Sequence, residues 1–292
     1  MSAFDEVADG ARAPLRTDRL GDQSERAYAA HNARAWEALA REGVPLATPA
    51  SDDELRHPLA TVDPAGWLGG DIRGWRVLCL AAGGGRHSAL YAAAGANVTV
   101  VDISGEMLAL DRAVAAERGF DVRLVQTSMD ELSMLAAGEF DLVIHPVSTC
   151  YVPDVAPVFA AVARVTRPGG LYISQHKSPV SMQASRSRLG GNFVLEEPYY
   201  REGPLPAAEP SRLREQGTLE FLHRWEQLLG GMCRAGFVIE DVLEPLHAES
   251  RATTEAGSFA DRARYVAPYV RIKARRRIAD ESLAGRSLIL SG

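Results

Sequence analysis

The sequence has few cysteines, no long apolar run and no excess of positive charge, and each shortage excludes a class of protein. Its 292 residues include three cysteines, at 79, 150 and 233, without CxxC spacing, so we expect neither a disulfide framework nor a metal site. No apolar run reaches the roughly 18 residues of a membrane helix, and no apolar signal segment is visible. A reducing cytoplasm and no membrane partner are predicted.

The charge balance bears on partners. The net charge is -6, and the basic cluster "RIKARRR" at 271–277 is better explained as a solvated helix end than as a nucleic-acid patch. We therefore expect no nucleic-acid partner. The chain is expected to be a monomer or a homodimer.

Short apolar segments alternate with helical patterns over most of the chain. Strands are predicted over 76–82, 97–103, 122–127, 140–146, 171–176, 237–244 and 264–274, and helices over 87–95, 105–119, 155–166 and 218–236. Such alternation indicates an α/β fold with a Rossmann-like, mostly parallel seven-stranded sheet and helices on both faces. The last two strands, joined by a loop, indicate an antiparallel strand at the sheet edge or inside the sheet.

Three regions are expected. Residues 1–22 are polar and predicted to be flexible. Residues 23–70 should form a helical cap and a proline-rich linker, the helix being capped by Ser24 and ending at Gly43. Residues 71–292 should form one domain, with a lid insertion at about 177–215 where the alternation stops.

Two features at strand ends predict a nucleoside-containing ligand. Glycines 83–85 follow the first strand, where missing side chains allow a ligand to approach the backbone. Asp102 ends the second strand, where a carboxylate can accept both hydroxyl protons of a ribose. In open parallel sheets, ligands bind outside these carboxyl ends. The alternative is a glycine turn beside a surface aspartate.

Later segments favour one cofactor. "FDLVIHPVSTCYVPD" at 140–154, followed by an "RPGG" turn at 167–170 and a strand, resembles the class I S-adenosylmethionine-dependent methyltransferases over about residues 75–176. The resemblance implies S-adenosylmethionine as cofactor and S-adenosylhomocysteine as product. The first motif, "VLCLAAGGG", departs from the family pattern, since Cys79 replaces the usual acid and Ala81 the first glycine.

The resemblance also assigns roles. Backbone carbonyls around Ala81 and Ala82 would receive the ammonium group of the cofactor, Asp102 its ribose, and Ile103 its adenine. In "TSMDEL", Asp130 would accept the adenine amino group. The alternative is a helix cap before "ELSML", and the two roles can coexist. The full set of predicted cofactor-binding residues is Tyr28, Ala81, Ala82, Gly83, Gly85, Asp102, Ile103, Met129, Asp130 and His145.

Residues near the methyl group and the acceptor are predicted from strand ends, the first helix and the lid. Candidate catalytic residues are His145, His176 and Tyr151. Candidate acceptor-contacting residues are Trp36, Tyr199, Tyr200, His223 and Arg224. Tyr28, Asn32 and Trp36 share one helix face, which could cover the cofactor or be purely structural.

The predicted function is methyl transfer to a small-molecule acceptor, with oxygen or nitrogen favoured over carbon. The "[DN]-P-P-[YFW]" motif of amino- and amide-directed methylases is replaced by "HPVS", which disfavours nucleic-acid bases. The alternatives are an NAD(P)-dependent oxidoreductase, a cofactor-binding module without catalysis, and a nucleic-acid methyltransferase. Ser88 stands where the G-x-G-x-x-G/A motif of dinucleotide-binding folds has its third glycine or alanine, which argues against the oxidoreductase.

Overall fold

The computed structural model describes residues 22–43, 48–207, 211–248 and 255–278. The predicted flexibility of residues 1–22 concerns a segment almost wholly outside this part. The first helix, α1 (Asp22–Glu42), begins two residues before the predicted cap Ser24. It ends as expected at Gly43, which has a φ of 68°. Helix starts are hard to predict to the residue because the first turn makes few internal hydrogen bonds.

The predicted sheet is confirmed. In the described residues, seven strands lie in the order β3-β2-β1-β4-β5-β7-β6, parallel except β7, which is antiparallel to both neighbours. The strands are β1 (Arg76–Leu80), β2 (Asn97–Asp102), β3 (Val122–Gln126), β4 (Phe140–His145), β5 (Thr166–Lys177), β6 (Phe237–Leu243) and β7 (Tyr269–Arg276). Because β7 runs antiparallel to β5, its first residues lie at the same sheet edge as the carboxyl end of β5.

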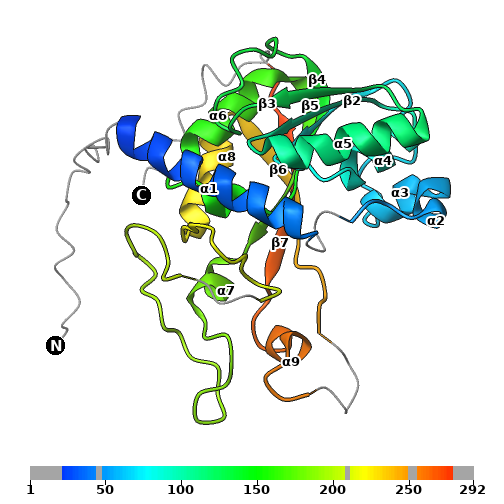
Figure 1. The fold of residues 1–292 in the computed structure, drawn as a ribbon. Coiled ribbons are helices and arrows are strands. Elements are labelled where there is room, and N and C mark those ends of the chain that lie inside the picture. The colour runs from blue at the N-terminus through cyan, green and yellow to red at the C-terminus, as the bar shows by residue number, and fades with distance from the viewer. Residues whose placement is uncertain (1–21, 44–47, 208–210, 249–254, 279–292) are drawn as a thin grey trace, which may run out of the picture.

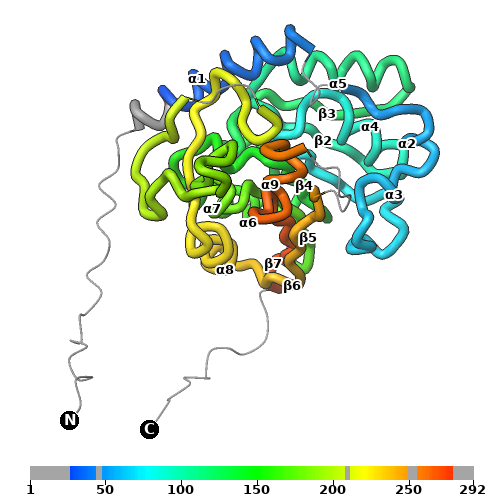
Figure 2. The backbone as a smooth tube through the Cα atoms, turned by 90° about the horizontal axis from the view of Figure 1, so that it is seen from below, coloured from blue at the N-terminus to red at the C-terminus, as the bar shows by residue number. Residues whose placement is uncertain are grey.

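Helices cover both sheet faces (Figures 1 and 2). Tyr91 of α4 and Leu108 of α5 pack on one face, whereas Phe159 of α6 and Met232 of α8 pack on the other. The helices are α2 (Asp52–Arg56), α3 (Pro58–Val62), α4 (Arg86–Ala93), α5 (Gly105–Arg118), α6 (Ala156–Val165), α7 (Pro179–Gln183), α8 (Gly231–Arg234) and α9 (Phe259–Ala263), with a 3-10 turn, η2 (Thr149–Tyr151), and a π-helical turn, η3 (Glu226–Gly230). Two apolar cores thus fix the sheet between two layers.

Predicted element boundaries fail where tertiary contacts compete with local preference. The predicted helix over 218–236 is helical only from Glu226. Before it, the backbone N–H groups of Leu219 and Phe221 bond to Asn32 Oδ1 and to the Cys150 carbonyl, at 2.8 and 2.7 Å. The predicted strand over 264–274 begins only at Tyr269, and α9 ends just before its predicted start. The basic cluster 271–277, predicted to be a helix end, lies instead almost wholly in β7, because these residues pair with β5 and β6.

The "RPGG" segment is part of β5 rather than a separate turn. The pairing of β4 with β5 shifts between Phe140 and Leu142, so the extra residues of β5 bulge out. Gly169 has a φ of 75°, and a Cβ on Gly170 would lie 2.9 Å from the Arg167 carbonyl oxygen. The two glycines therefore allow the backbone to form this bulge.

The described part of segment 177–215 is fastened to the rest of the domain. The guanidinium of Arg262, at the end of α9, is 2% exposed and donates to the carbonyls of Ser185, Ser181 and Ala184 at 2.8–3.1 Å. In Figure 1 this segment, with α7, and α9 extend together beyond the sheet. Its function as a lid remains a prediction.

Candidate active site

A cavity of about 390 Å³ lies at the carboxyl ends of β1, β2 and β4. It is lined by Tyr28, Ala29, Asn32, Trp36, Ala81, Ala82, Gly83, His87, Val101, Asp102, Ile103, Met107, Thr127, Ser128, Met129, Asp130, Pro146, Val147, Ser148, Tyr151, Val152, Pro153, Asp154, Pro157, Gln175, Glu215, Tyr269 and Arg271. The position agrees with the ligand edge of an open parallel sheet.

Asp102 and the glycine turn are in direct contact. The Gly83 N–H donates to Asp102 Oδ2 and the Ser104 N–H to Oδ1, both at 2.9 Å. A Cβ on Gly83 would lie 2.8 Å from Met107 Cβ and 2.9 Å from Asp102 Oδ2, so only glycine fits. Burial raises the pKa of Asp102, although bonds from Ser104 and Gly83 oppose the shift.

Ala81 occupies a backbone conformation that favours glycine. Its φ is 47°, and it is the one residue other than glycine with positive φ in the described part of the chain. Its N–H donates to the Val101 carbonyl at 2.7 Å, which holds the end of β1 beside β2. A side chain in the left-handed region costs about 1 kcal/mol or more, so Ala81 is a strained departure from the family's glycine.

Asp111 is a functional-site neighbour that the sequence analysis missed. Its carboxylate accepts from the N–H groups of Gly84 and Gly85, at 2.9 and 3.1 Å, and from the Ser88 hydroxyl. It thus occupies the amino end of α4, the position where a dinucleotide fold binds pyrophosphate. Burial raises the pKa of Asp111 to about 6. An acid on the same face of α5 as Met107 and Val114 was the available signal.

The predicted adenine-binding residues gather at one end of the cavity. Ile103, Met129 and Asp130 line it beside Asp102. The Thr127 N–H donates to the Asp102 carbonyl at 3.1 Å, which joins the segment after β3 to the end of β2. None of residues 131–135 is helical, so Asp130 is not a helix cap, and its carboxylate, which accepts from Ser128, lines the cavity.

Helix α1 covers the cavity through the predicted face. Tyr28, Asn32 and Trp36 line it, and the Trp36 ring packs edge-on against Tyr151 at 5.6 Å between centroids. The Asn32 amide donates to the Tyr151 and Leu219 carbonyls at 2.9 and 3.1 Å. One buried amide therefore fixes the helix over the cavity.

The three predicted histidines are not among the cavity-lining residues. His145 Nδ1 bonds to the Tyr172 hydroxyl, and His176 bonds through its two ring nitrogens to Thr149 and Ser174, each at 2.8 Å. His223 Nε2 donates to the carbonyls of Thr149 and Val152. Strand alternation points His145 and His176 into the layer under α6.

Burial keeps these rings neutral. It lowers the pKa of His145 to about 3 and that of His223 to about 4, and it lowers the pKa of His176 well below its ordinary value. Because none of the three rings lines the cavity, the function proposed below assigns them no role.

Other predicted residues also lie away from the cavity. Tyr199 and Tyr200 stack edge-on at 5.3 Å, and Tyr200 is 75% exposed with the Arg224 guanidinium over its ring. Gly85 faces Asp111 and Val114 of α5 and does not line the cavity. Aromatic composition alone could not show which lid residues reach the site.

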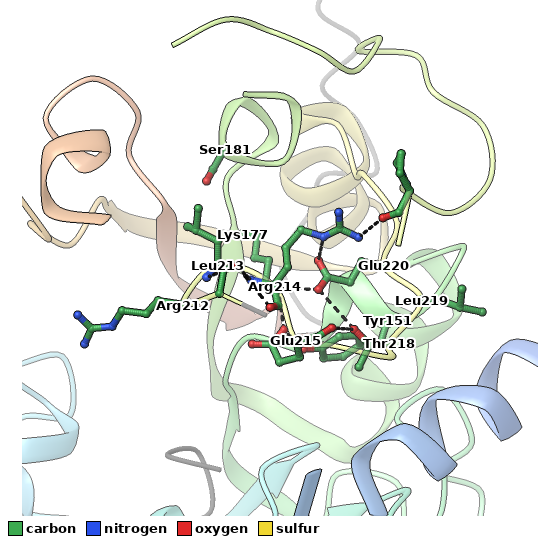
Figure 3. A network of polar contacts seen from close by, with 12 residues as sticks. Tyr151, Lys177, Ser181, Arg212, Leu213, Arg214, Glu215, Thr218, Leu219 and Glu220 are labelled. Atoms are coloured by element: carbon green, nitrogen blue, oxygen red, sulfur yellow. Dashed lines mark hydrogen bonds and ion pairs between the residues drawn. The ribbon is translucent and has the colours of Figure 1, made fainter. Parts of the chain in front are cut away.

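Tyr151 and Glu215 join the cavity to a buried network of charges (Figure 3). The Tyr151 hydroxyl and Lys177 Nζ both donate to Glu215 Oε2, at 2.7 and 2.9 Å. Lys177 also pairs with Glu220 at 3.1 Å, and Glu220 with Arg214 at 3.2 Å. Burial opposes the charge of Lys177, but the acidic neighbours outweigh it and its pKa is raised. Glu215 was missed because it ended the segment predicted as lid.

A second missed group lines the side of the cavity near β5 and β7. It comprises His87, Gln175, Tyr269 and Arg271. Arg271 Nε donates to Gln175 Oε1 at 2.6 Å. Burial, with the charges of Arg86 and Arg271, lowers the pKa of His87 to about 4. This end of the cavity is polar and carries a cation.

Comparisons with known proteins identify the family. A methyltransferase-domain model matches residues 78–174. The "uncharacterized methyltransferase YbaJ" of Bacillus subtilis is 34% identical over 234 residues, 75% of this chain and 91% of that protein. The chain belongs to the class I S-adenosylmethionine-dependent methyltransferases. It is an S-adenosylmethionine-dependent enzyme, as the sequence motifs predicted.

Other relatives of this methyltransferase add to the picture. A ubiquinone biosynthesis O-methyltransferase of Aromatoleum aromaticum is 38% identical over 117 residues, 39% of this chain, and the match spans 50% of that protein. The crystal structure of an S-adenosylmethionine-dependent methyltransferase from Mesorhizobium loti superposes with a TM-score of 0.58 at 23% identity, covering 73% of this chain and 96% of that one. The latter supports the fold.

A membrane-spanning helix and a metal-binding cluster are both absent from the described residues. These residues contain no helix long and apolar enough to cross a bilayer. They contain no cluster of three or more histidine, cysteine or acidic side chains that could hold a metal ion.

Proposed function

We propose that this methyltransferase binds S-adenosylmethionine across the ends of β1, β2 and β3 and methylates an oxygen or nitrogen atom of a small molecule. Asp102 would hold the ribose, Met129 and Asp130 the adenine, and the carbonyls of Ala81 and Ala82 the methionine ammonium. The observation that carries the proposal is a single cavity that joins these groups to Tyr151 and Glu215.

The residues present fit this cofactor better than a dinucleotide. The backbone at Gly83 leaves no room for a side chain, and Asp102 is fixed beside it. The amino end of α4, which would take a pyrophosphate, is occupied by Asp111. A negative charge fixed there repels a second anion, which counts against the oxidoreductase alternative.

The residues of the chain would align the acceptor with the methyl group and remove a proton from the acceptor. When bound, the cofactor supplies a methyl group activated on a sulfonium, whose carbon–sulfur bond breaks as the bond to the acceptor forms. Glu215 Oε2 accepts from Tyr151 and Lys177, and no bond to its Oε1 is found within the described residues. We assign Oε1 as the acceptor of the proton that the hydroxyl or neutral amine of the acceptor loses when it is methylated. The name of the ubiquinone-pathway relatives supports oxygen.

The direct test is calorimetric titration of the purified chain with S-adenosylmethionine, S-adenosylhomocysteine and NADH. We expect binding of the two sulfur compounds and none of NADH. Release of S-adenosylhomocysteine is then followed with panels of phenols, alcohols and amines. Binding of NADH alone would support the oxidoreductase, and cofactor binding without turnover of any acceptor would support a non-catalytic binding module.

A further inference from the structure

The cations of β7 differ in their partners. On one face of the strand, Lys273 and Arg275 both pair with Glu240, at 3.2 and 3.0 Å. Arg271, two residues before Lys273 on the same face, pairs with no carboxylate among the described residues. The one hydrogen bond of its side chain among these residues runs from Nε to the neutral amide of Gln175, and the side chain lines the cavity.

The sheet holds this guanidinium in a fixed direction. Arg271 lies directly opposite Gln175 in the antiparallel pair of β7 with β5, and Tyr269 lies opposite Lys177 two residues away. The bond from Nε to Gln175 leaves both Nη groups free of bonds to the described residues. A planar guanidinium so held matches the two oxygens of a carboxylate.

The ligand for this cation belongs to the acceptor end. Arg271 is on β7, whereas the turn expected to hold the methionine end follows β1, and β4 and β5 separate the two. Three strand spacings amount to about 14 Å. Glu215, in contrast, bonds to Lys177, which lies two cross-strand pairs from Arg271, about 7 Å along the strand.

We propose that Arg271, oriented by Gln175, is the anchor for a carboxylate of the acceptor, so that the substrate is a carboxylic acid whose methylated oxygen or nitrogen lies toward Glu215. The proposal rests on the proposed function, since it assigns the acceptor half of the same cavity. His87, neutral at pH 7 and also lining the cavity, can donate a further hydrogen bond to the carboxylate.

The test measures binding rather than turnover. The full chain, saturated with S-adenosylhomocysteine, is titrated calorimetrically with benzoate, 3,4-dihydroxybenzoate and 3-hydroxybutanoate, each beside its neutral methyl ester. The variants are Arg271→Gln, Arg271→Lys and the control Arg275→Gln, which removes an equal charge from the same strand outside the cavity. Circular dichroism checks that each variant is folded.

We expect at least one carboxylate to bind the wild type about tenfold or more tightly than its ester. Arg271→Gln should remove that preference, Arg271→Lys should keep part of it, and Arg275→Gln should keep all of it. The affinity for S-adenosylhomocysteine should stay within about threefold in every variant.

Three results would overturn the assignment. One is the absence of any carboxylate preference in the wild type, and another is a preference that persists in Arg271→Gln. The third is a loss of S-adenosylhomocysteine affinity in Arg271→Gln, which would place the cofactor's own carboxylate on Arg271. Failure of S-adenosylhomocysteine to bind the wild type at all would instead contradict the proposed function.

Discussion

Single residues of the cofactor half make separable contributions. Asp102 accepts two backbone hydrogen bonds in the structure, and in our proposal it also accepts the ribose hydroxyls. We expect Asp102→Ala to weaken binding of S-adenosylhomocysteine about 100-fold, because two charge-assisted bonds are lost. Calorimetry would measure this, with the exposed Asp121→Ala as control. Unchanged affinity in a folded Asp102→Ala variant would disprove the ribose assignment.

Substitution by glycine should change the free energy of unfolding in opposite directions at Ala81 and Ala82. Relief of the left-handed strain by Ala81→Gly should exceed the entropy cost of glycine and raise the free energy of unfolding by about 0.5 kcal/mol. Ala82→Gly relieves no such strain and should lower it by about 0.5–1 kcal/mol. Urea denaturation of the two variants measures the contrast, and equal losses would show that Ala81 is not strained.

Glu215 is the residue on which proton removal depends in our proposal. Glu215→Gln keeps the shape of the side chain but removes the proton acceptor, so kcat with a hydroxyl acceptor should fall about 100-fold or more. The affinity for S-adenosylhomocysteine should change little, because Glu215 lies beyond the expected cofactor end. The exposed Glu202→Gln is the control. An unchanged kcat would assign Glu215 a purely structural role with Lys177.

At the scale of elements, α5 stabilises the start of α4 through Asp111. The folded-state pKa of about 6 lies above the ordinary 3.8, so the folded protein binds this proton more tightly than the unfolded chain. The contribution of this group to stability is therefore fully present below about pH 4 and is lost as the pH rises to about 6.

Comparison with Asp111→Asn isolates that effect. We expect the free energy of unfolding of the wild type to fall relative to that of the variant between pH 4 and pH 6, as measured by urea denaturation. A difference that does not change over this interval would show that the folded-state pKa is not raised.

Helices and strands differ in how closely the local sequence pattern predicts their positions. The buried strands β1, β2 and β4 follow from short apolar runs, and their predicted positions agree with the structure to within about two residues. Residues 218–225 have the pattern of a helix but bond instead to Asn32, Cys150 and Leu205. Hydrogen bonds to residues far away in sequence outweigh a local preference of a few tenths of a kcal/mol per residue.

At the scale of the whole molecule, the cavity connects parts that are distant in sequence. Helix α1, the strand ends and residue 215 all contribute to its wall, and Arg41 of α1 also pairs with Glu106 of α5 at 3.0 Å. A ligand in this cavity should therefore stabilise the domain as a unit.

Thermal unfolding gives the corresponding prediction. S-adenosylhomocysteine at 100 times its Kd should stabilise the fold by about 2.7 kcal/mol and raise Tm by about 5 to 10 °C. NADH at the same concentration should leave Tm unchanged. A rise in Tm with NADH alone would contradict the cofactor assignment. The measurement with NADH also serves as the control for non-specific effects on Tm.

The sequence by itself determined the sheet and the cofactor end of the cavity. Apolar runs specify strands, parallel strands bring their carboxyl ends together, and Gly83, Asp102 and Asp130 are therefore neighbours as soon as the order of strands is known. Only the tertiary structure decided the acceptor end. His145 and His176 end strands just as Asp102 does, but their side chains point into a core layer, and Glu215 and Arg271 reach the cavity through a loop and an antiparallel strand that local pattern does not position.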